Sequence, residues 1–510
     1  MVFAMSSALD LLLIVPRANL ATTLYAAVIC YVLYALVYQA YRAFAGPLSK
    51  FPGPKLRAFS PIPECLDLIR GTEAQSVVAL HQKYGNVVRV SPNTLSFIGT
   101  QQAWSDIYGF KKSGIPENYK DPEFYMKSFN GHYDLVRSPD SHHGRQRKVV
   151  SHGFSERALK EQEPMLKSYA NKLSEFLIRK AASGKSVDMV LAFNFATFDI
   201  MGEWPKDVYL YRLLTHLVAA DLTFAESLHM LDMGKNEKWV RNIFASIKFK
   251  NYIRAARAFS FFTRVLVTQL TTRIPSIKKR AADHFKFTTD RVAKRLSHNS
   301  DRPDIFTRII EKGGHPTAPN PQLPLGELQV IAAMFMLAGT ETTATGRNLP
   351  FLVLTITDII AALSGLTYHL LRHPEWMKKL QDEVRSSLSG LDDMNLHTLA
   401  RLPILEACIK EALRMFPPVP NGTPRVASHD GVLVAGWHVP KGTQMFVHHL
   451  ATYRAEQIFK HAAEFHPERW MGYPEFKNDS PDAFEPWVVG PRACIGKAGL
   501  VELFERRYYD

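Results

Sequence analysis

The segment 487–496 constrains the fold of this chain more than any other feature of its sequence. It reads WVVGPRACIG, so a Gly490-Pro turn comes just before Cys494, and a helix is predicted to begin soon after. Backbone N–H groups at a helix start, with Arg492 nearby, favour a thiolate over a thiol. Gly496 leaves room beside that sulfur for a large flat group. A cysteine by itself is more often a small buried apolar residue, so the prediction rests on the whole pattern.

A second charged pattern lies upstream, in a helix predicted from Leu405 to Phe416. Glu411 and Arg414 are three residues apart there and share one helix face. Arg469 follows later, within the sequence FHPERW. An exposed ion pair of this spacing would contribute only about 0.2–0.5 kcal/mol, which is the plainer alternative.

A third pattern, AGTETT at 338–343, ends the apolar helical run Ile331–Leu337. Glycine and hydroxyl side chains are unfavourable inside a helix, and a threonine there can bond back to a carbonyl and bend it. Such a defect opens room on one side of the helix. It can also serve packing alone.

These patterns, in the order in which they occur along the chain, resemble the haem-thiolate enzymes of the cytochrome P-450 family. Segment 487–496 is similar to the haem-binding loop FxxGxRxCxG, with Trp487 where phenylalanine is usual. The resemblance implies that Cys494 is the axial ligand of a haem iron and that Arg492 contacts a haem propionate. A thiolate ligand pushes electron density toward the iron and favours O–O cleavage.

The resemblance also implies roles for the other charged residues. Glu411, Arg414 and Arg469 look like the ExxR helix and its partner arginine, which lock the fold beneath the haem and have a structural role. Glu341 and Thr342 look like the acid–alcohol pair that relays protons to bound dioxygen.

Two further arginines are expected at the propionates. Arg147 stands where the WxxxR pattern of the family has its arginine, with His143 in place of the tryptophan, before a helix predicted at Val149–Leu159. Arg425 follows the ExxR helix, in a strand. An arginine binds a carboxylate with two parallel hydrogen bonds, although a solvated arginine is the alternative for each position.

The resemblance implies a mainly α fold, one large helical domain with small β-sheets, behind an N-terminal transmembrane helix. The predicted organisation is an anchor at 1–45, a proline-rich hinge at 46–63, and a haem-thiolate monooxygenase domain at 64–510. A chain of 510 residues would ordinarily split into several domains, but no Gly/Ser linker divides this one. Short paired strands are predicted at Val87–Val90 and Thr94–Ile98.

The anchor is predicted from the uncharged stretch Ala21–Tyr41, which is long enough to cross a bilayer as a helix. A buried core helix is the alternative. Basic residues follow the stretch, among them Arg42, Lys50 and Lys55, so the positive-inside rule leaves the catalytic domain in the cytoplasm. We therefore expect a single-pass protein of the endoplasmic reticulum membrane.

The formal net charge of +14 fits an anionic membrane surface and an acidic protein partner, and no nucleic-acid motif appears. The resemblance implies an NADPH-dependent flavoprotein reductase as that partner. Four cysteines are too few for a disulfide scaffold.

Three stretches depart from the family pattern. Trp204–Ala220 interrupts a smooth motif, Gly346–Ala361 falls within the helix that carries Glu341, and the sequence after Lys497 differs from the long helix that the family has there. Translated introns and an altered C-terminus would explain these departures, and genuine surface loops are the alternative.

The predicted activity is the insertion of one oxygen atom into an apolar small molecule, by hydroxylation or epoxidation, in fungal secondary metabolism. The haem would be iron protoporphyrin IX. The alternatives are a haem-thiolate isomerase or dehydratase, and a mis-spliced product that does not assemble its site. The sequence carries no readable code for the substrate.

Overall fold

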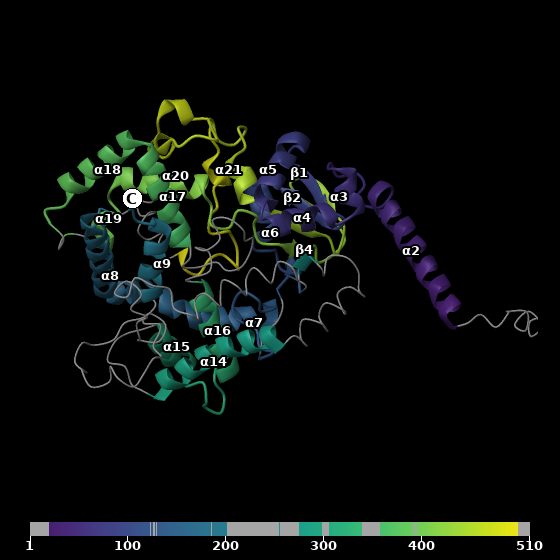
Figure 1. The fold of residues 1–510 in the computed structure, drawn as a ribbon, viewed down its shortest axis with the longest axis horizontal. Coiled ribbons are helices and arrows are strands. Elements are labelled where there is room, and N and C mark those ends of the chain that lie inside the picture. The colour runs from purple at the N-terminus through teal and green to yellow at the C-terminus, as the bar shows by residue number, and fades with distance from the viewer. Residues whose placement is uncertain are drawn as a thin grey trace, which may run out of the picture.

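The computed structural model describes residues 20–200, 254–255, 275–297, 305–338 and 358–497, apart from positions 123, 126, 127, 129, 185, 391, 392 and 394. Helices dominate this part of the chain, and the small sheets lie on the side from which the N-terminal helix projects (Figure 1). The predicted mainly α fold with small sheets is confirmed.

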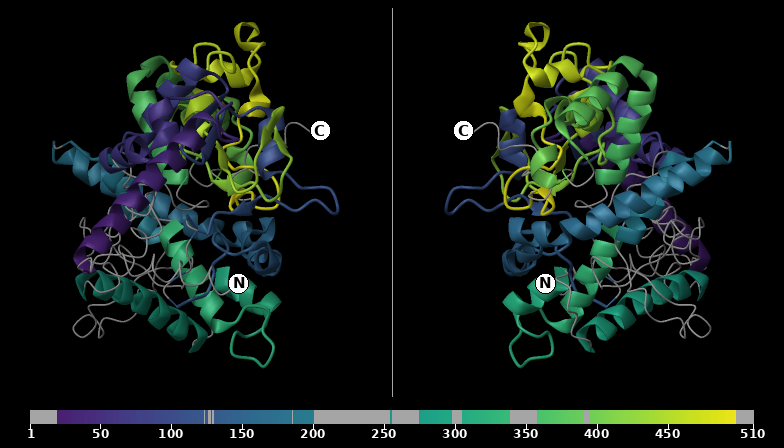
Figure 2. Two further views of the ribbon diagram at one scale, coloured as in Figure 1. Left: turned by 90° about the vertical axis from the view of Figure 1, so that its right-hand side faces the viewer. Right: turned by 90° about the vertical axis from the view of Figure 1, so that its left-hand side faces the viewer.

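The α-helices are α2 (Leu20–Phe44), α3 (Lys55–Phe59), α4 (Ile62–Arg70), α5 (Glu73–Tyr84), α6 (Gln101–Tyr108), α7 (Asp140–Val150), α8 (Glu156–Ala182), α9 (Met189–Ile200), α14 (Pro275–Ser297), α15 (Ile305–Gly313), α16 (Leu325–Ala338), α17 (Asp358–Arg372), α18 (Pro374–Ser387), α19 (Leu396–Leu399), α20 (Pro403–Met415) and α21 (His449–Tyr453). Short 3₁₀ turns are η1 (Ser151–Phe154), η4 (Pro467–Met471), η5 (Pro474–Phe476) and η6 (Pro481–Ala483). Figure 2 shows the teal helices α14–α16 at the end of the molecule opposite the yellow C-terminal segments.

The strands are β1 (Val87–Ser91), β2 (Thr94–Phe97), β3 (Tyr119–Lys120), β4 (Arg425–Val426), β5 (Val432–Val434), β6 (Trp437–Val439) and β7 (Gln444–Val447). Five of them form a sheet in the order β1-β2-β7-β4-β3, and β5 and β6 form a separate antiparallel pair. The predicted pairing of the strands near 87–98 is confirmed, since β1 and β2 are antiparallel neighbours. β4 lies between β7 and β3, so Arg425 pairs with Met445 on one side and Lys120 on the other.

Helix α2 covers the predicted anchor, and its segment Tyr25–Phe44 is long and apolar enough to cross a membrane. The proline-rich segment after it packs on the sheet instead of standing free: Phe51 is buried in the cluster that contains Leu95 and Met445.

Helix α16 is mostly buried where the structure describes its side chains, with Ile331, Ala332 and Phe335 fully inaccessible. An apolar helix without a polar face belongs in a protein core. The motif residues Glu341 and Thr342 follow its last described turn.

The prediction of one helix at Val149–Leu159 is wrong. Helix α7 ends at Val150, a 3₁₀ turn follows, and α8 begins at Glu156. Ser155 starts this second helix, because its side chain accepts a hydrogen bond from the backbone N–H of Ala158. Arg147 consequently lies inside α7, not ahead of a helix.

Candidate functional site

The loop that carries Cys494 is folded back on itself and held against helix α6. The backbone N–H of Cys494 donates to the Trp487 carbonyl at 2.9 Å, which closes the turn. Gly490 has φ = 81°, and a Cβ there would lie 2.0 Å from the Tyr108 carbonyl oxygen, so only glycine fits. Val488 also has a positive φ of 59°, a strained conformation for a β-branched residue. The surrounding packing therefore fixes the position of this loop.

The sulfur-bearing side chain of Cys494 is buried between the loop and helix α20. It packs with Leu413 of α20 and with Trp487. Helix α7 reaches the same place, because Nη1 of Arg147 donates to the Ala493 carbonyl at 2.7 Å. The structure thus places the predicted residues Arg147 and Cys494 side by side. Helical backbone begins again at Lys497, close to the predicted start.

A cluster of basic side chains surrounds this region. Its members come from three places in the fold, namely β3 and β4, helix α7, and the cysteine loop. We call them the basic cluster: Lys120, His143, Arg147, Arg425 and Arg492.

Burial and mutual repulsion disfavour the charged forms in the basic cluster. Burial lowers the pKa of Lys120 well below its ordinary value, and the charges of Arg425 and Arg492 lower it further. The pKa of His143 falls to about 2 for the same reasons, with Arg492 as the largest charge effect after burial. Like charges that share a buried site raise its electrostatic energy unless an anion joins them.

The carboxylates of the described chain balance little of this charge. Asp140 forms an ion pair with Arg492, whereas Asp134 is engaged by Arg137 at 2.8 Å. Nη1 of Arg492 is buried without a hydrogen-bond partner in the described structure. Arg425 lies over the Tyr108 ring at 5.6 Å.

These observations fit the haem that the sequence predicts. A buried thiol beside an excess of cations offers one soft ligand for iron and several donors for two carboxylates. Arg425, Arg492 and Arg147 would donate to the carboxylates, and the Cys494 sulfur would bind the metal.

Lys120 is the member of this cluster that sequence reasoning missed. It follows Tyr119 in a stretch of sequence with no motif of its own, and only the pairing of β3 with β4 brings it opposite Arg425. Its Nζ donates to the Val136 carbonyl and lies 4.7 Å from the Tyr125 ring centroid. A lysine next to aromatic residues was the available signal, and it is too common to be diagnostic.

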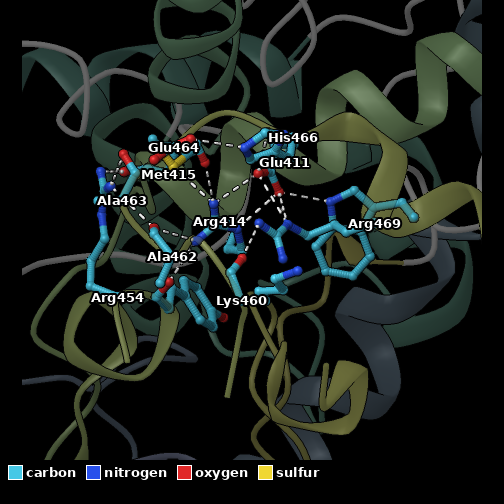
Figure 3. Close-up of polar contacts among 12 residues, drawn as sticks. Glu411, Arg414, Met415, Arg454, Lys460, Ala462, Ala463, Glu464, His466 and Arg469 are labelled. Carbon is cyan, nitrogen blue, oxygen red and sulfur yellow. Dashed lines mark hydrogen bonds and ion pairs between the residues drawn. The ribbon is translucent and has the colours of Figure 1, made fainter. Parts of the chain in front are cut away.

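Glu411, Arg414 and Arg469 lie together, as predicted (Figure 3). The Glu411 carboxylate accepts two hydrogen bonds from Arg414, at 2.8 and 2.9 Å. It also accepts from Arg469 Nε at 3.2 Å, from Trp470 Nε1 at 2.9 Å and from the His466 backbone N–H at 2.8 Å. Both side chains of the Glu411–Arg414 pair are fully buried, so the exposed-pair alternative is excluded.

The arginines of this cluster carry their bonds onward to the backbone. Nη1 of Arg414 donates to the Tyr453 and Ala462 carbonyls at 2.7 and 2.8 Å, and Nη2 to the Glu464 carbonyl at 2.8 Å. Arg469 donates to the Lys460 carbonyl at 2.9 Å (Figure 3). Helix α20 is thereby tied to the irregular segment 453–470.

Burial alone would raise the pKa of Glu411. The hydrogen bonds and charge of Arg414, together with the charge of Arg469, outweigh that effect and bring the pKa below its ordinary value. The carboxylate is therefore ionised at neutral pH.

Glu341 and Thr342 lie outside the described residues, and so do Trp204–Ala220 and the chain after Lys497. Of the suspected segment Gly346–Ala361, the structure describes only the last four backbone positions, which form the first turn of α17.

Comparisons with known proteins agree with this picture. The family model described as Cytochrome P-450 matches residues 55–204 and 209–499. The break between the two matched blocks falls inside the suspected segment Trp204–Ala220.

Two similar proteins are named as cytochrome P-450 monooxygenases. One, efuB of Hormonema carpetanum, is 41% identical over 472 residues, covering 92% of this chain and 85% of that protein. The other, rdc4 of Metacordyceps chlamydosporia, is 36% identical over 478 residues, covering 92% and 87%. An averantin hydroxylase of Dothistroma septosporum is 32% identical over 465 residues, covering 91% and 79%.

Proposed function

The chain belongs to the cytochrome P-450 family, and on that premise we propose that Cys494 is the axial thiolate ligand of its haem iron. The enzyme is a monooxygenase, like its relatives. The observation that carries the assignment is the buried Cys494 loop beside the basic cluster, which among the described residues has Asp140 as its paired carboxylate and a buried Arg492 Nη1 without a partner. When bound, the haem supplies the activation of dioxygen.

The basic cluster would hold the two haem carboxylates. Arg425 and Arg492 reach this place from β4 and the cysteine loop, and Arg147 from α7. Arginine pairs bidentately with a carboxylate, which fixes the orientation of the group as well as its affinity. Two carboxylates would neutralise most of the charge that the fold leaves unbalanced.

Glu411, Arg414 and Arg469 would act structurally, beneath the haem. Leu413, next to Arg414 in α20, packs against Cys494. The position of α20 therefore determines where the Cys494 loop can lie. All three would be required for a folded haem site without contacting the substrate.

Glu341 and Thr342 would hold and move the protons that the reaction consumes. A carboxylate and a hydroxyl in adjacent positions can pass protons from solvent to a buried acceptor. The overall reaction consumes one dioxygen, two electrons and two protons, and yields the oxygenated product and water.

The two electrons would come from NADPH through a membrane-bound flavoprotein reductase. The excess of basic residues suits an acidic docking partner. Helix α2 would anchor the enzyme in the endoplasmic reticulum membrane with the catalytic domain in the cytoplasm, following the basic residues after the span.

The substrate class that fits best is an apolar small molecule, oxidised by hydroxylation or epoxidation. The similar proteins are fungal enzymes of secondary metabolism, among them one named for hydroxylating averantin. None of the relatives named above is an isomerase or a dehydratase.

The replacement Cys494→Ala tests the ligand assignment. We expect it to abolish the red-shifted Soret band of the reduced, carbon-monoxide-bound enzyme, because no other thiolate would reach the iron. Cys408→Ala is the matched control, since Cys408 is also buried but lies in the apolar cluster of α17, α18 and α20. That variant should keep the band. A thiolate-type spectrum in Cys494→Ala would contradict the assignment.

Thr342→Ala tests the proton relay. We expect electron consumption to continue while product formation falls, with the difference released as reduced oxygen species. The ratio of product to NADPH consumed measures this coupling. An unchanged ratio would remove Thr342 from the relay.

Two experiments test the hypothesis that Trp204–Ala220 and Gly346–Ala361 are translated introns. One sequences the transcript, and the other expresses a chain that lacks both segments. Spliced messenger that still encodes them, together with a normal carbon monoxide band from the full chain, would refute it. If the hypothesis is right, the shortened chain gives the larger band.

A further inference from the structure

The hydroxyl group of Tyr108, the last residue of α6, bridges two segments of the five-stranded sheet. It donates to the Thr423 carbonyl at 2.8 Å and accepts from the Val447 backbone N–H at 3.1 Å. The side chain is buried, and α6 packs against β7, the strand that contains Val447. A phenol hydroxyl can donate and accept, and here backbone groups take both roles.

The register of β4 and β7 shows which bond this hydroxyl replaces. In their antiparallel pairing, the backbone N–H of Ala427, just after β4, donates to the Thr443 carbonyl at 3.0 Å. Hydrogen-bonded pairs recur at every second residue of an antiparallel ladder, so Arg425 and then Thr423 would follow, with Thr423 opposite Val447. The phenol hydroxyl stands between the groups of that last pair, and β4 accordingly begins only at Arg425.

The segment before Thr423 is held closely against β7. A Cβ at Gly422, where φ is 77°, would lie 1.9 Å from the Val447 carbonyl oxygen, so only glycine fits. The Pro420 carbonyl accepts from the Leu450 N–H at 3.0 Å. Thr423 therefore lies between a fixed segment and β4, and the Tyr108 hydroxyl sets the separation of its carbonyl from β7.

The ring of Tyr108 supports the side chain of Arg425. The guanidinium lies 5.6 Å from the ring centroid, a distance at which the face of an aromatic ring attracts a cation. Arg425 follows Thr423 by two residues, so the hydroxyl fixes the backbone of this segment and the ring fixes its cation. An arginine must lose rotamer freedom before it can hold a carboxylate in one geometry, and a supported arginine has less freedom left to lose.

The end of α6 also contacts the other two segments that supply the basic cluster beside α7. Two carbonyl groups of its last turn accept from Nδ2 of Asn118, two residues before Lys120, at 3.1 and 3.2 Å. The Tyr108 carbonyl oxygen packs against Gly490, two residues before Arg492. The carbonyl end of a helix carries partial negative charge, which favours nearby cations. One helix end thus supports β3, β4 and the cysteine loop.

We propose that Tyr108 is a positioning residue for the haem carboxylates, because its hydroxyl and its ring together direct Arg425 toward them from the end of α6. The inference rests on the proposed haem site. Tyr108 acts through Arg425 and is not itself a ligand of the haem. A tyrosine that only filled the core would affect haem binding equally whether or not Arg425 was present.

The first test measures hydrogen exchange at the Val447 amide of the full chain. Tyr108→Phe removes the acceptor of this amide, and the remaining ring still keeps the Thr423 carbonyl away, so the amide should exchange at least about fivefold faster. Tyr169→Phe is the control, because Tyr169 is also a buried tyrosine but lies on α8, in a different core cluster. That variant should keep the parental exchange rate at Val447. Unchanged exchange in Tyr108→Phe would refute the bridge.

The second test determines whether the hydroxyl acts through Arg425. Transfer of haem to apomyoglobin should be at least about fivefold faster from Tyr108→Phe than from the parent, and faster also from Arg425→Gln. Adding Tyr108→Phe to Arg425→Gln should change the rate by less than about twofold, because no guanidinium is left to direct. An equal factor in both backgrounds would show a structural role and overturn the proposal.

The two measurements separate this proposal from the haem assignment. If the parent shows no thiolate-type carbon monoxide band, the proposed function fails, while exchange at Val447 still reports on the hydroxyl bridge. If the band is present and the effects of Tyr108→Phe and Arg425→Gln are independent, the haem assignment stands and the positioning role of Tyr108 fails.

Discussion

Two buried charged clusters of this protein are built on opposite plans. The cluster around Glu411 contains two arginines, Arg414 and Arg469, and two carboxylates, Glu411 and Asp479. The hydrogen bonds of Glu411 and of both guanidinium groups are made within the chain. The basic cluster around Arg425 collects basic side chains from several elements. Asp140 is the carboxylate of the described chain that pairs with it, and Nη1 of Arg492 is left without a partner.

The difference separates a structural device from a binding site. Burying charges costs free energy unless partners compensate for the lost water, and the Glu411 cluster supplies those partners itself. The basic cluster does not, so the fold holds it at a cost that a bound dianion would offset. Removing a charge should therefore have opposite consequences in the two places.

The largest effect is expected for Glu411→Gln. The change leaves Arg414 buried without its counter-ion, while Arg469 keeps its ion pair with Asp479. Breaking a buried pair in this way costs about 3–5 kcal/mol. The free energy of unfolding, measured with urea, should fall by that amount.

Glu175→Gln is the control, because Glu175 forms an i,i+4 ion pair with Arg179 in which both side chains are more than half exposed. Such pairs contribute at most about 1 kcal/mol. If the two variants lost equal stability, the Glu411 cluster would not be the structural device described.

The sequence predicts the Glu411 cluster well and the basic cluster only in part. Glu411 and Arg414 lie on one helix, so their contact follows from local spacing, and the FHPERW segment supplies Arg469. Arg425 and Lys120, in contrast, are 305 residues apart and meet only through strand pairing.

The helix boundary near Ser155 failed for a related reason. A single helix was predicted at Val149–Leu159. In the structure, the Ser155 cap and the close packing of Gly153 against Ile305 separate α7 from α8. Local patterns predicted local contacts, and tertiary contacts decided the rest.

For Lys120→Met we expect a smaller effect, in which the protein is not destabilised but binds haem less tightly. Removing one of several like charges should leave the unfolding free energy unchanged or raised, because the buried Lys120 repels Arg425 and Arg492. Loss of a charge-assisted hydrogen bond to a haem carboxylate contributes about 1.5–3 kcal/mol, so haem should dissociate at least about tenfold faster.

Transfer of haem to apomyoglobin measures that rate. Arg308→Met is the control, because Arg308 of α15 is paired with Glu161 of α8 and with Glu311 and is not a member of the basic cluster. This variant should keep the parental rate. A Lys120→Met variant that is destabilised but retains haem normally would show that Lys120 is structural.

The smallest effect concerns pH and again distinguishes the clusters. The pKa of His143 lies near 2 in the fold because of burial and of Arg492, Lys120, Arg147 and Arg425. The unfolded chain takes up a proton on this residue below about 6.5, and the folded chain does not, so stability falls as pH falls through that value.

His143→Gln should therefore reduce the loss of unfolding free energy between pH 7 and pH 5.5 by about 1 kcal/mol, since one such group contributes up to about 1.4 kcal/mol per pH unit. Glu411→Gln should leave the loss in this window unchanged, because the lowered pKa of Glu411 keeps that carboxylate ionised throughout. Urea unfolding at the two pH values measures both.

Bound haem carboxylates would favour protonated His143, so the dependence of the unfolding free energy on pH should be weaker in the haem-loaded enzyme. A slope that is equal with and without haem would place His143 too far from the carboxylates to feel their charge.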